Sequence, residues 1–98
     1  MSSLLLSGVI DVFDDFLIAK DERVELDLHD MQVDEARFYL EQAIDKAEYN
    51  IKMIEVVHGY RKGQAILNMV RHEFKHKRID KKVVPFNKGT TLIFLKQA

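Results

Sequence analysis

The chain has 98 residues, which suffice for one domain and are too few for two. Hydrophobic residues make up 47% and charged residues 32%, so the composition fits one modest core and excludes a disordered chain. The sequence holds no cysteine, which excludes disulfides, Cys-based zinc sites and thiol redox motifs. It has no apolar run of membrane-spanning length, and its start is a poor signal peptide, so we expect a cytoplasmic protein.

The net charge of -1 conceals an uneven distribution of charge along the chain. Residues 1–50 hold 4 Lys/Arg against 13 Asp/Glu, whereas residues 51–98 hold 11 Lys/Arg against 3 Asp/Glu. A basic half can form a basic face that attracts a polyanion. It can equally pair with the acidic half, and charge alone does not decide between the two.

Residues 1–22 are assigned to an N-terminal extension and residues 23–98 to the domain. Apolar residues between Val9 and Leu17 lie at near-helical spacing, which predicts a short amphipathic helix. Leu4–Leu6 is an alternative short strand.

The first predicted elements of the domain are a strand and a helix. Residues Arg23–His29 alternate between apolar and polar, as a half-buried strand does. A helix is predicted from about Val33 to Tyr49, with Asn50 as its C-terminal stop. Its apolar stripe consists of Val33, Ala36, Leu40, Ala43, Ile44 and Ala47.

The second half of the chain predicts three strands and a second helix. Ile51–Val57 is mostly apolar and should be a central strand. A helix is expected over about Gln64 to His76, with Arg71 facing outward, followed by strands at Lys82–Phe86 and Thr90–Leu95. The order β-α-β-α-β-β predicts an α/β fold, an α+β two-layer sandwich with helices packed on a small mixed sheet.

The first candidate for chemistry is the segment Leu26–Met31 at the end of the first strand. Asp27 and His29 lie two residues apart and therefore on the same face of the strand. A carboxylate in this position can hydrogen-bond the imidazole, fix its tautomer and raise its basicity, which suits acid–base catalysis. The plainer interpretation, a polar strand end that caps the next helix, is the favoured one on these residues alone.

The second candidate is the loop His58–Gly63 between the second strand and the second helix. Its two glycines allow close approach of a ligand to the backbone, and Arg61 and Lys62 add positive charge. An ordinary turn that needs glycine for its dihedral angles is equally consistent with the sequence. Both candidate segments follow parallel strands, so His29 and His58 should meet at the same edge of the sheet, where ligands gather.

Further candidates lie near the C-terminus. The segment Asn87–Gly89 is most simply a tight turn, in which Lys88 could face a phosphate. Basic residues from Arg71 onward, Lys75 among them, could follow a nucleic-acid backbone. Tyr60 and Phe86 are candidates for base stacking. The histidines at 72 and 76 are expected to be surface residues rather than metal ligands.

These segments resemble the motifs of the Smr (small MutS-related) domain family. Leu26–Met31 resembles its L-D-L-H-G-M motif, and His58–Gly63 resembles its H-G-x-G-x-G loop, in the H-G-Y-x-x-G form of short stand-alone bacterial members. Asn87–Leu92 is similar to the family's closing N-x-G-x-T segment. Asp30 departs from the pattern, because it stands where the first motif usually has glycine. Arg61 stands where the longer loop form has its middle glycine.

The resemblance implies a β-α-β-α-β-β fold related to the C-terminal domain of a bacterial translation initiation factor. It also implies binding to DNA or RNA and, as in several members, DNA nicking or RNA cleavage. By this resemblance Asp27 and His29 would carry the chemistry, and His58, Gly59 and Gly63 would shape the nucleic-acid loop. His58 is a third catalytic candidate, because it could stabilise charge on the phosphate. The nucleic-acid-binding residues would be Gly59, Tyr60, Arg61, Lys62, Gly63, Arg71, Lys75 and Lys88.

We therefore expect a nucleic-acid-binding domain. Whether it is also an endonuclease acting on DNA or RNA is left open by the sequence. No resident metal or other cofactor is expected, although a divalent ion at Asp27 and the histidines is an alternative for the cleaving form. The alternatives are a non-catalytic adaptor for structured RNA, ribosomes or branched DNA, with a ribosome or repair protein as partner, and a protein-interaction module. No membrane partner is expected.

Overall fold

The computed structural model describes residues 18–61 and 64–97 of the chain. The expected elements of the N-terminal extension before residue 18 lie outside this range, as do Lys62 and Gly63. A 3₁₀ turn, η1 (Lys20–Glu22), leads into the domain. The elements that follow are β1 (Arg23–Asp27), α3 (Val33–Lys46), β2 (Met53–Val57), α4 (Ala65–Asn68), the π-helical turn η2 (Met69–Glu73), β3 (Ile79–Val83) and β4 (Thr90–Leu95).

The four strands form one mixed sheet in the order β1-β2-β4-β3, which confirms the predicted architecture. Strand β1 pairs parallel with β2, and β4 pairs antiparallel with both β2 and β3. The apolar strands β2 and β4 are central, as strands buried on both sides usually are. The edge position of β1 explains why Val24, expected to face the core, keeps 36% of its surface exposed.

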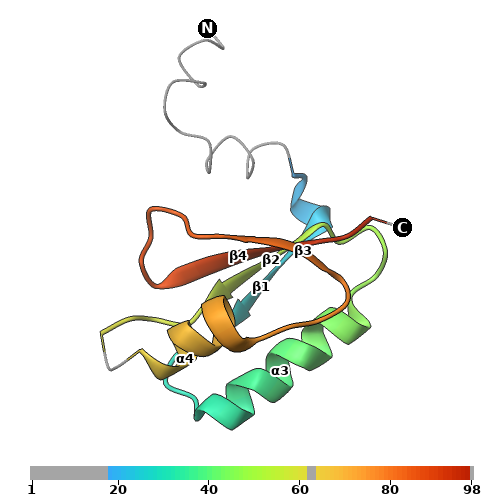
Figure 1. Cartoon of the computed structure of the whole chain (residues 1–98). Coiled ribbons are helices and arrows are strands. Elements are labelled where there is room, and N and C mark those ends of the chain that lie inside the picture. The colour runs from blue at the N-terminus through green and yellow to red at the C-terminus, as the bar shows by residue number, and fades with distance from the viewer. Residues whose placement is uncertain (1–17, 62–63, 98) are drawn as a thin grey trace, which may run out of the picture.

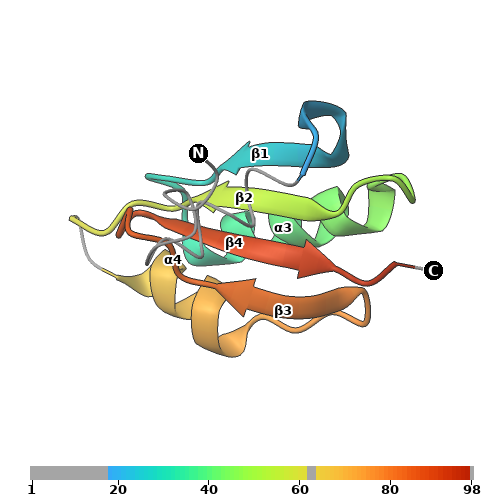
Figure 2. The ribbon, with the colours of Figure 1, turned by 90° about the horizontal axis from the view of Figure 1, so that it is seen from above.

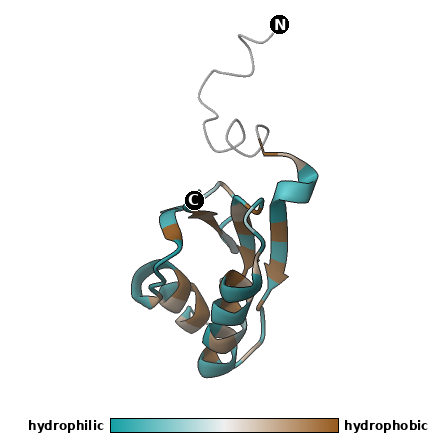
Figure 3. Ribbon diagram, turned by 90° about the vertical axis from the view of Figure 1, so that its right-hand side faces the viewer, coloured by the Kyte–Doolittle hydropathy of each residue, from teal (hydrophilic) through white to brown (hydrophobic). Residues whose placement is uncertain are grey.

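Both helices cover the same face of the sheet (Figures 1 and 2). The connections β1–α3–β2 and β2–α4–β3 each join parallel strands and step across the sheet in the same direction. Connections of one handedness therefore place their helices on one side. Hydrophobic and hydrophilic segments alternate along both helices, as amphipathic packing requires (Figure 3). Among the described residues, no helix has the length and apolarity needed to cross a membrane.

Helix α3 carries the expected apolar stripe but ends earlier than predicted. Ala36, Leu40 and Ile44 are fully buried in the core. The helix stops at Lys46 because its last carbonyl groups are bound by another segment: Arg78 Nη1 donates to Ile44 O (2.6 Å) and to Ala47 O (2.8 Å). Those bonds satisfy groups that a helix end leaves without a partner.

The second helix differs most from its prediction. Only Ala65–Asn68 is α-helical, and the chain then widens into the π-helical turn η2, in which Phe74 N–H donates to Met69 O (2.7 Å). The wider turn lets Met69, Val70 and Phe74 all face the core. The sequence prediction assumes 3.6 residues per turn along the whole segment. It therefore leaves Met69 out of the apolar stripe and extends the helix to His76, three residues beyond the end of η2.

Strand β3 begins and ends three residues before its predicted limits. It starts at Ile79, with an irregularity in its pairing to β4 between Ile79 and Lys81, and Phe86 lies in the following loop with 76% of its surface exposed. The prediction of a turn at Asn87–Gly89 is confirmed. There, Asn87 accepts hydrogen bonds from Gly89 N–H at its side chain (2.9 Å) and from Thr90 N–H at its carbonyl (3.2 Å).

Candidate nucleic-acid interface

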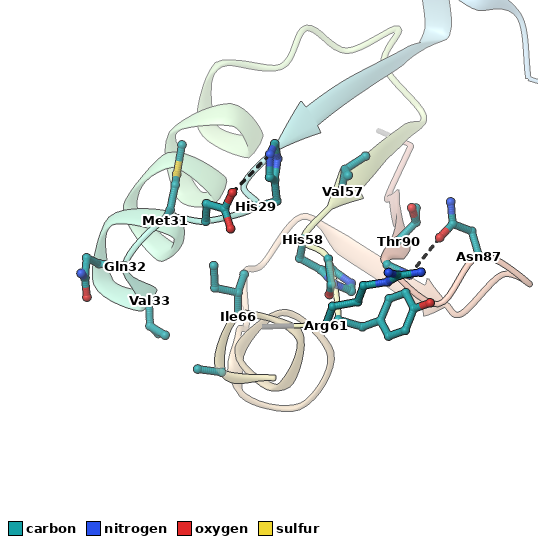
Figure 4. Close-up of a pocket in the computed structure, with 15 residues that line it drawn as sticks. His29, Met31, Gln32, Val33, Val57, His58, Arg61, Ile66, Asn87 and Thr90 are labelled. Atoms are coloured by element: carbon teal, nitrogen blue, oxygen red, sulfur yellow. Dashed lines mark hydrogen bonds and ion pairs between the residues drawn. The ribbon is translucent and has the colours of Figure 1, made fainter. Parts of the chain in front are cut away.

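A pocket of about 630 Å³ lies where β1 and β2 end (Figure 4). Three segments distant in sequence form its wall, namely residues 29–33, residues 57–61 and the turn residues Asn87, Gly89 and Thr90, together with the start of α4. The carboxyl ends of parallel strands are where ligands bind in sheets of this kind. His29 and His58 both line the pocket, so the expectation that their segments converge is confirmed.

His29 stands at the rim of this pocket with its ring bound to Asp27. Its Nδ1–H donates to Asp27 Oδ1, and its backbone N–H donates to the same oxygen at 3.1 Å. These two hydrogen bonds hold the pKa of Asp27 below its ordinary value, so its carboxyl stays ionised. The hydrogen bond to the carboxylate fixes the proton on Nδ1. The other ring nitrogen, Nε2, is directed away from Asp27.

Asp30 gives the turn after β1 its shape. Its φ of 68° is left-handed, a conformation that aspartate tolerates better than most residues, which accounts for aspartate where the family motif has glycine. Its Oδ2 lies 3.6 Å from His29 Nε2, so the imidazole sits between two carboxylates. Sequence reasoning did not anticipate this second acidic neighbour.

Two glycine backbones bring the second and third segments into contact. Gly59 has a φ of 78°, and Gly89 lies so close that an added Cβ would be 3.3 Å from Gly59 Cα. Gly89 O accepts the backbone N–H groups of His58 (2.8 Å) and Gly59 (3.0 Å). The closing motif of the sequence therefore acts structurally, as the wall against which the His58 loop packs.

His58 is buried behind this contact, with 5% of its surface exposed. Its Nδ1–H donates to Gly59 O (2.8 Å), and its Nε2 accepts from the Thr91 hydroxyl (2.8 Å). Burial, which outweighs the hydrogen bond to Gly59, lowers the pKa of His58, and the Arg71 charge lowers it further. Both ring nitrogens are occupied within the protein, so this imidazole is placed to hold the loop rather than to face a substrate.

Arg71 belongs to the same network, and the expectation that it faces outward is wrong. Its Nε–H donates to Thr91 Oγ1 (2.8 Å), and its Nη2 donates to the carbonyls of Lys88 (3.2 Å) and Thr90 (2.9 Å). The guanidinium thus fastens the helix layer to the turn before β4. Thr91, the shared partner of His58 and Arg71, is fully buried. Sequence reasoning noted it only as part of the closing motif and gave it no role of its own.

The remaining predicted binding residues occupy more accessible positions. Arg61 and Tyr60 line the pocket and are exposed, with the Arg61 guanidinium 5.9 Å from the centre of the Tyr60 ring. Lys88 is exposed in the turn before β4, and Lys75 is exposed after η2; neither lines the pocket. Lys62 and Gly63 lie outside the described residues.

The histidines of the second helix region have no part in the pocket. His72 is exposed, as expected, whereas the side chain of His76 is 8% exposed and its Nε2–H donates to Asp45 Oδ1 (2.7 Å). Within residues 18–61 and 64–97, no group of three or more His, Asp or Glu side chains is arranged to hold a metal ion.

Comparison with known proteins bears on the same three segments. The family model described as "Smr domain" matches residues 26–93. The crystal structure of the Smr domain of Thermus thermophilus MutS2 is similar, with a TM-score of 0.58 and 26% sequence identity over 74% of this chain and 96% of that domain. No curated protein sequence gives a significant match. The matched range contains the end of β1, the residues that line the pocket and the first four residues of β4, and the chain therefore belongs to the Smr domain family, a family of nucleic-acid-binding domains.

Proposed function

We propose that this domain binds DNA or RNA at the pocket edge and contacts phosphates through Arg61 and Lys88. Both side chains are exposed, and they lie on the two segments that the Gly59–Gly89 contact joins. Positive side chains at neighbouring positions suit a phosphate backbone, whose charges repeat at short intervals. Arg71 and His58 serve in this proposal as supports of the binding surface and make no contact with the nucleic acid.

The same proposal includes cleavage of a phosphodiester bond, with His29 as the proton-transfer group. The observation that carries it is the Asp27–His29 pair at the pocket rim, because a carboxylate-held imidazole can accept or donate a proton at its other nitrogen. Arg61, which lines the same pocket, would stabilise charge that develops on the phosphate.

A non-catalytic adaptor is the second candidate, and one observation favours it. Asp30 lies beside the nitrogen of His29 that would serve the substrate, and it would repel an approaching phosphate. In this form the pocket edge binds structured RNA or branched DNA without cutting it.

Binding is tested by fluorescence anisotropy with labelled DNA and RNA at two salt concentrations. If 3–5 phosphates are contacted, affinity should fall about 10²-fold between low and physiological salt. Arg61→Ala and Lys88→Ala should each lower the salt slope by roughly one unit. The matched control is Lys20→Ala, which removes the same charge from η1, before the opposite end of β1. Equal binding by all variants at both salts would contradict the proposal.

Cleavage is tested by incubating the same substrates with and without divalent metal ions. Asp27→Asn and His29→Ala should each lower the rate about 10²-fold, and the double variant should lose little more, because the pair acts as one unit. Undiminished cleavage by the double variant would move the chemistry elsewhere. Binding without any cleavage by the wild type would leave the adaptor form.

A further inference from the structure

The pocket has one feature that phosphate binding does not require, an apolar wall. Partly buried Met31, Val33 and Ile66 line it and also pack against the hydrophobic core. Their positions are therefore fixed by the fold, and this side of the pocket exists before a ligand arrives. In Figure 4, Met31 and Val33 lie on the side opposite Asn87. Ile66 lies between these two residues and Asn87.

The other side of the pocket is polar, and the Arg61 guanidinium gives it positive charge. Arg61 and Asn87 line it, and the exposed ring of Tyr60 lies beside Arg61. His29 lines the pocket nearer to Met31, and the acidic Asp30, between these two residues in sequence, lines it as well. A volume of about 630 Å³ falls within the range of about 300–1,000 Å³ of sites that enclose a small molecule. The pocket is thus suited to a ligand with one flat apolar part and one anionic part.

A fully paired duplex does not offer a flat apolar part to such a pocket. Within a duplex the faces of the bases are covered by their neighbours, and a protein meets only base edges and phosphates. A base that leaves the stack exposes a flat face, which aromatic and aliphatic side chains accept.

We propose that this pocket binds a single unpaired nucleotide, with its base between Tyr60 and the apolar wall and its phosphate toward Arg61. The inference rests on the proposed function and narrows it to nucleic acids that contain a bulge, loop or frayed end. One base stacked on an aromatic side chain supports a preference of about tenfold over the fully paired form.

The test compares two hairpins of the same sequence, one fully paired and one with a single bulged nucleotide, each as DNA and as RNA. Affinity is measured by anisotropy at low salt, and 2-aminopurine at the bulge reports whether that base changes surroundings. The wild type should bind the bulged hairpin about tenfold more tightly. Equal affinity for both hairpins would overturn the inference and leave the proposed function standing. Binding of neither hairpin would overturn the proposed function and the inference with it.

Two matched variants locate the effect. Ala65→Trp fills the pocket from an exposed position at the start of α4 and should lower affinity for the bulged hairpin about tenfold, with no change in the 2-aminopurine signal on binding. The control is Asn68→Trp, exposed on the same helix and outside the pocket, which should leave both affinities unchanged.

If Ala65→Trp keeps the preference for the bulged hairpin, the inference is overturned. It is also overturned if Asn68→Trp loses this preference to the same extent as Ala65→Trp. Circular dichroism checks the fold of each variant. If Ala65→Trp fails to fold, the exposed substitution Tyr60→Leu takes its place and should reduce the preference, whereas an unchanged preference would overturn the inference.

Discussion

The two histidines of the motifs have opposite surroundings, although the sequence gives them the same candidate role. His29 has a side chain 56% exposed and faces solvent at the rim, whereas His58 is buried and accepts a hydrogen bond from a residue 33 positions away. Sequence reasoning found the Asp27–His29 pair because two residues of one strand end share a face. It could not find the Thr91 partner of His58, because that contact depends on where β4 enters the sheet.

The buried state of His58 makes stability depend on pH. The folded state holds this imidazole neutral, with its pKa below the ordinary value of 6.5 that applies to the unfolded chain. As pH falls below about 6.5, the unfolded chain takes up a proton that the folded state does not, so the free energy of unfolding should decrease. Urea denaturation between pH 7.5 and 5 should show this decrease in the wild type and a weaker one in His58→Gln. All other side chains are the same in the two proteins, so parallel curves would contradict the expectation.

The hydroxyl of Thr91 links the buried imidazole to Arg71. Thr91→Val keeps the shape of the side chain but leaves His58 Nε2 and Arg71 Nε without this partner, which should cost about 1–3 kcal/mol of the free energy of unfolding. Thr91→Ser retains the hydroxyl and loses one methyl group, so it should cost only about 1 kcal/mol. Urea denaturation measures both variants. A larger loss for serine than for valine would show that packing, not hydrogen bonding, matters at this position.

At the scale of elements, the periodicity of the sequence predicted which elements exist and both limits of β4, but not where α3, the second helix and β3 end. The limits of α3 and β3 depend on contacts with distant residues, such as Arg78 with the carbonyls at the end of α3. The π-helical turn η2 breaks the period on which a stripe prediction depends. The central strands β2 and β4 were identified well, because most of their residues are apolar.

The segment after η2 closes the C-terminal end of α3. Arg78 donates to the carbonyls of Ile44 and Ala47, and His76 pairs with Asp45 in the same turn. Arg78→Ala should cost about 1–2 kcal/mol, because bonds from a charged donor to buried acceptors exceed the usual value. Hydrogen exchange should speed up at the last turn of α3 and stay unchanged at β2. Lys46→Ala, an exposed substitution on the same turn, is the control and should change neither. If Arg78→Ala instead speeds up exchange equally in all segments, the contact contributes only to global stability.

At the scale of the whole molecule, ion pairs join the acidic half of the chain to the basic half. Among the described residues they include Lys52–Glu22 (3.4 Å), Arg37–Glu73 (3.5 Å) and the His76–Asp45 pair. Such surface pairs contribute about 1 kcal/mol or less each. Of the basic residues of the second half, Arg61, Lys75 and Lys88 are exposed and can meet a polyanion, whereas Arg71 and Arg78 are bound within the domain.

Residues 1–17 contribute three aspartates and no basic residue, so their removal changes the net charge from -1 to +2. The core cluster of the described chain runs from Leu28 to Leu95, and a chain of Met followed by residues 18–98 should still unfold cooperatively. Its affinity for nucleic acid should rise at low salt, because less negative charge opposes the polyanion. Thermal denaturation and anisotropy test the two expectations. Loss of cooperative unfolding would place part of the core in residues 1–17.

The position of β4 has a consequence for how the domain is made in the cell. This strand is the last of the four to be synthesised, yet it lies between β2 and β3 and supplies Thr91 and Ile93 to the interior. A nascent chain that has emerged only as far as β3 holds two parallel strands and a third strand with no neighbour. It also lacks the Gly89 carbonyl that orders the His58 loop. The pocket can therefore assemble only after translation has passed Leu95, so a truncated product would expose an open, apolar sheet edge and lack the proposed binding site.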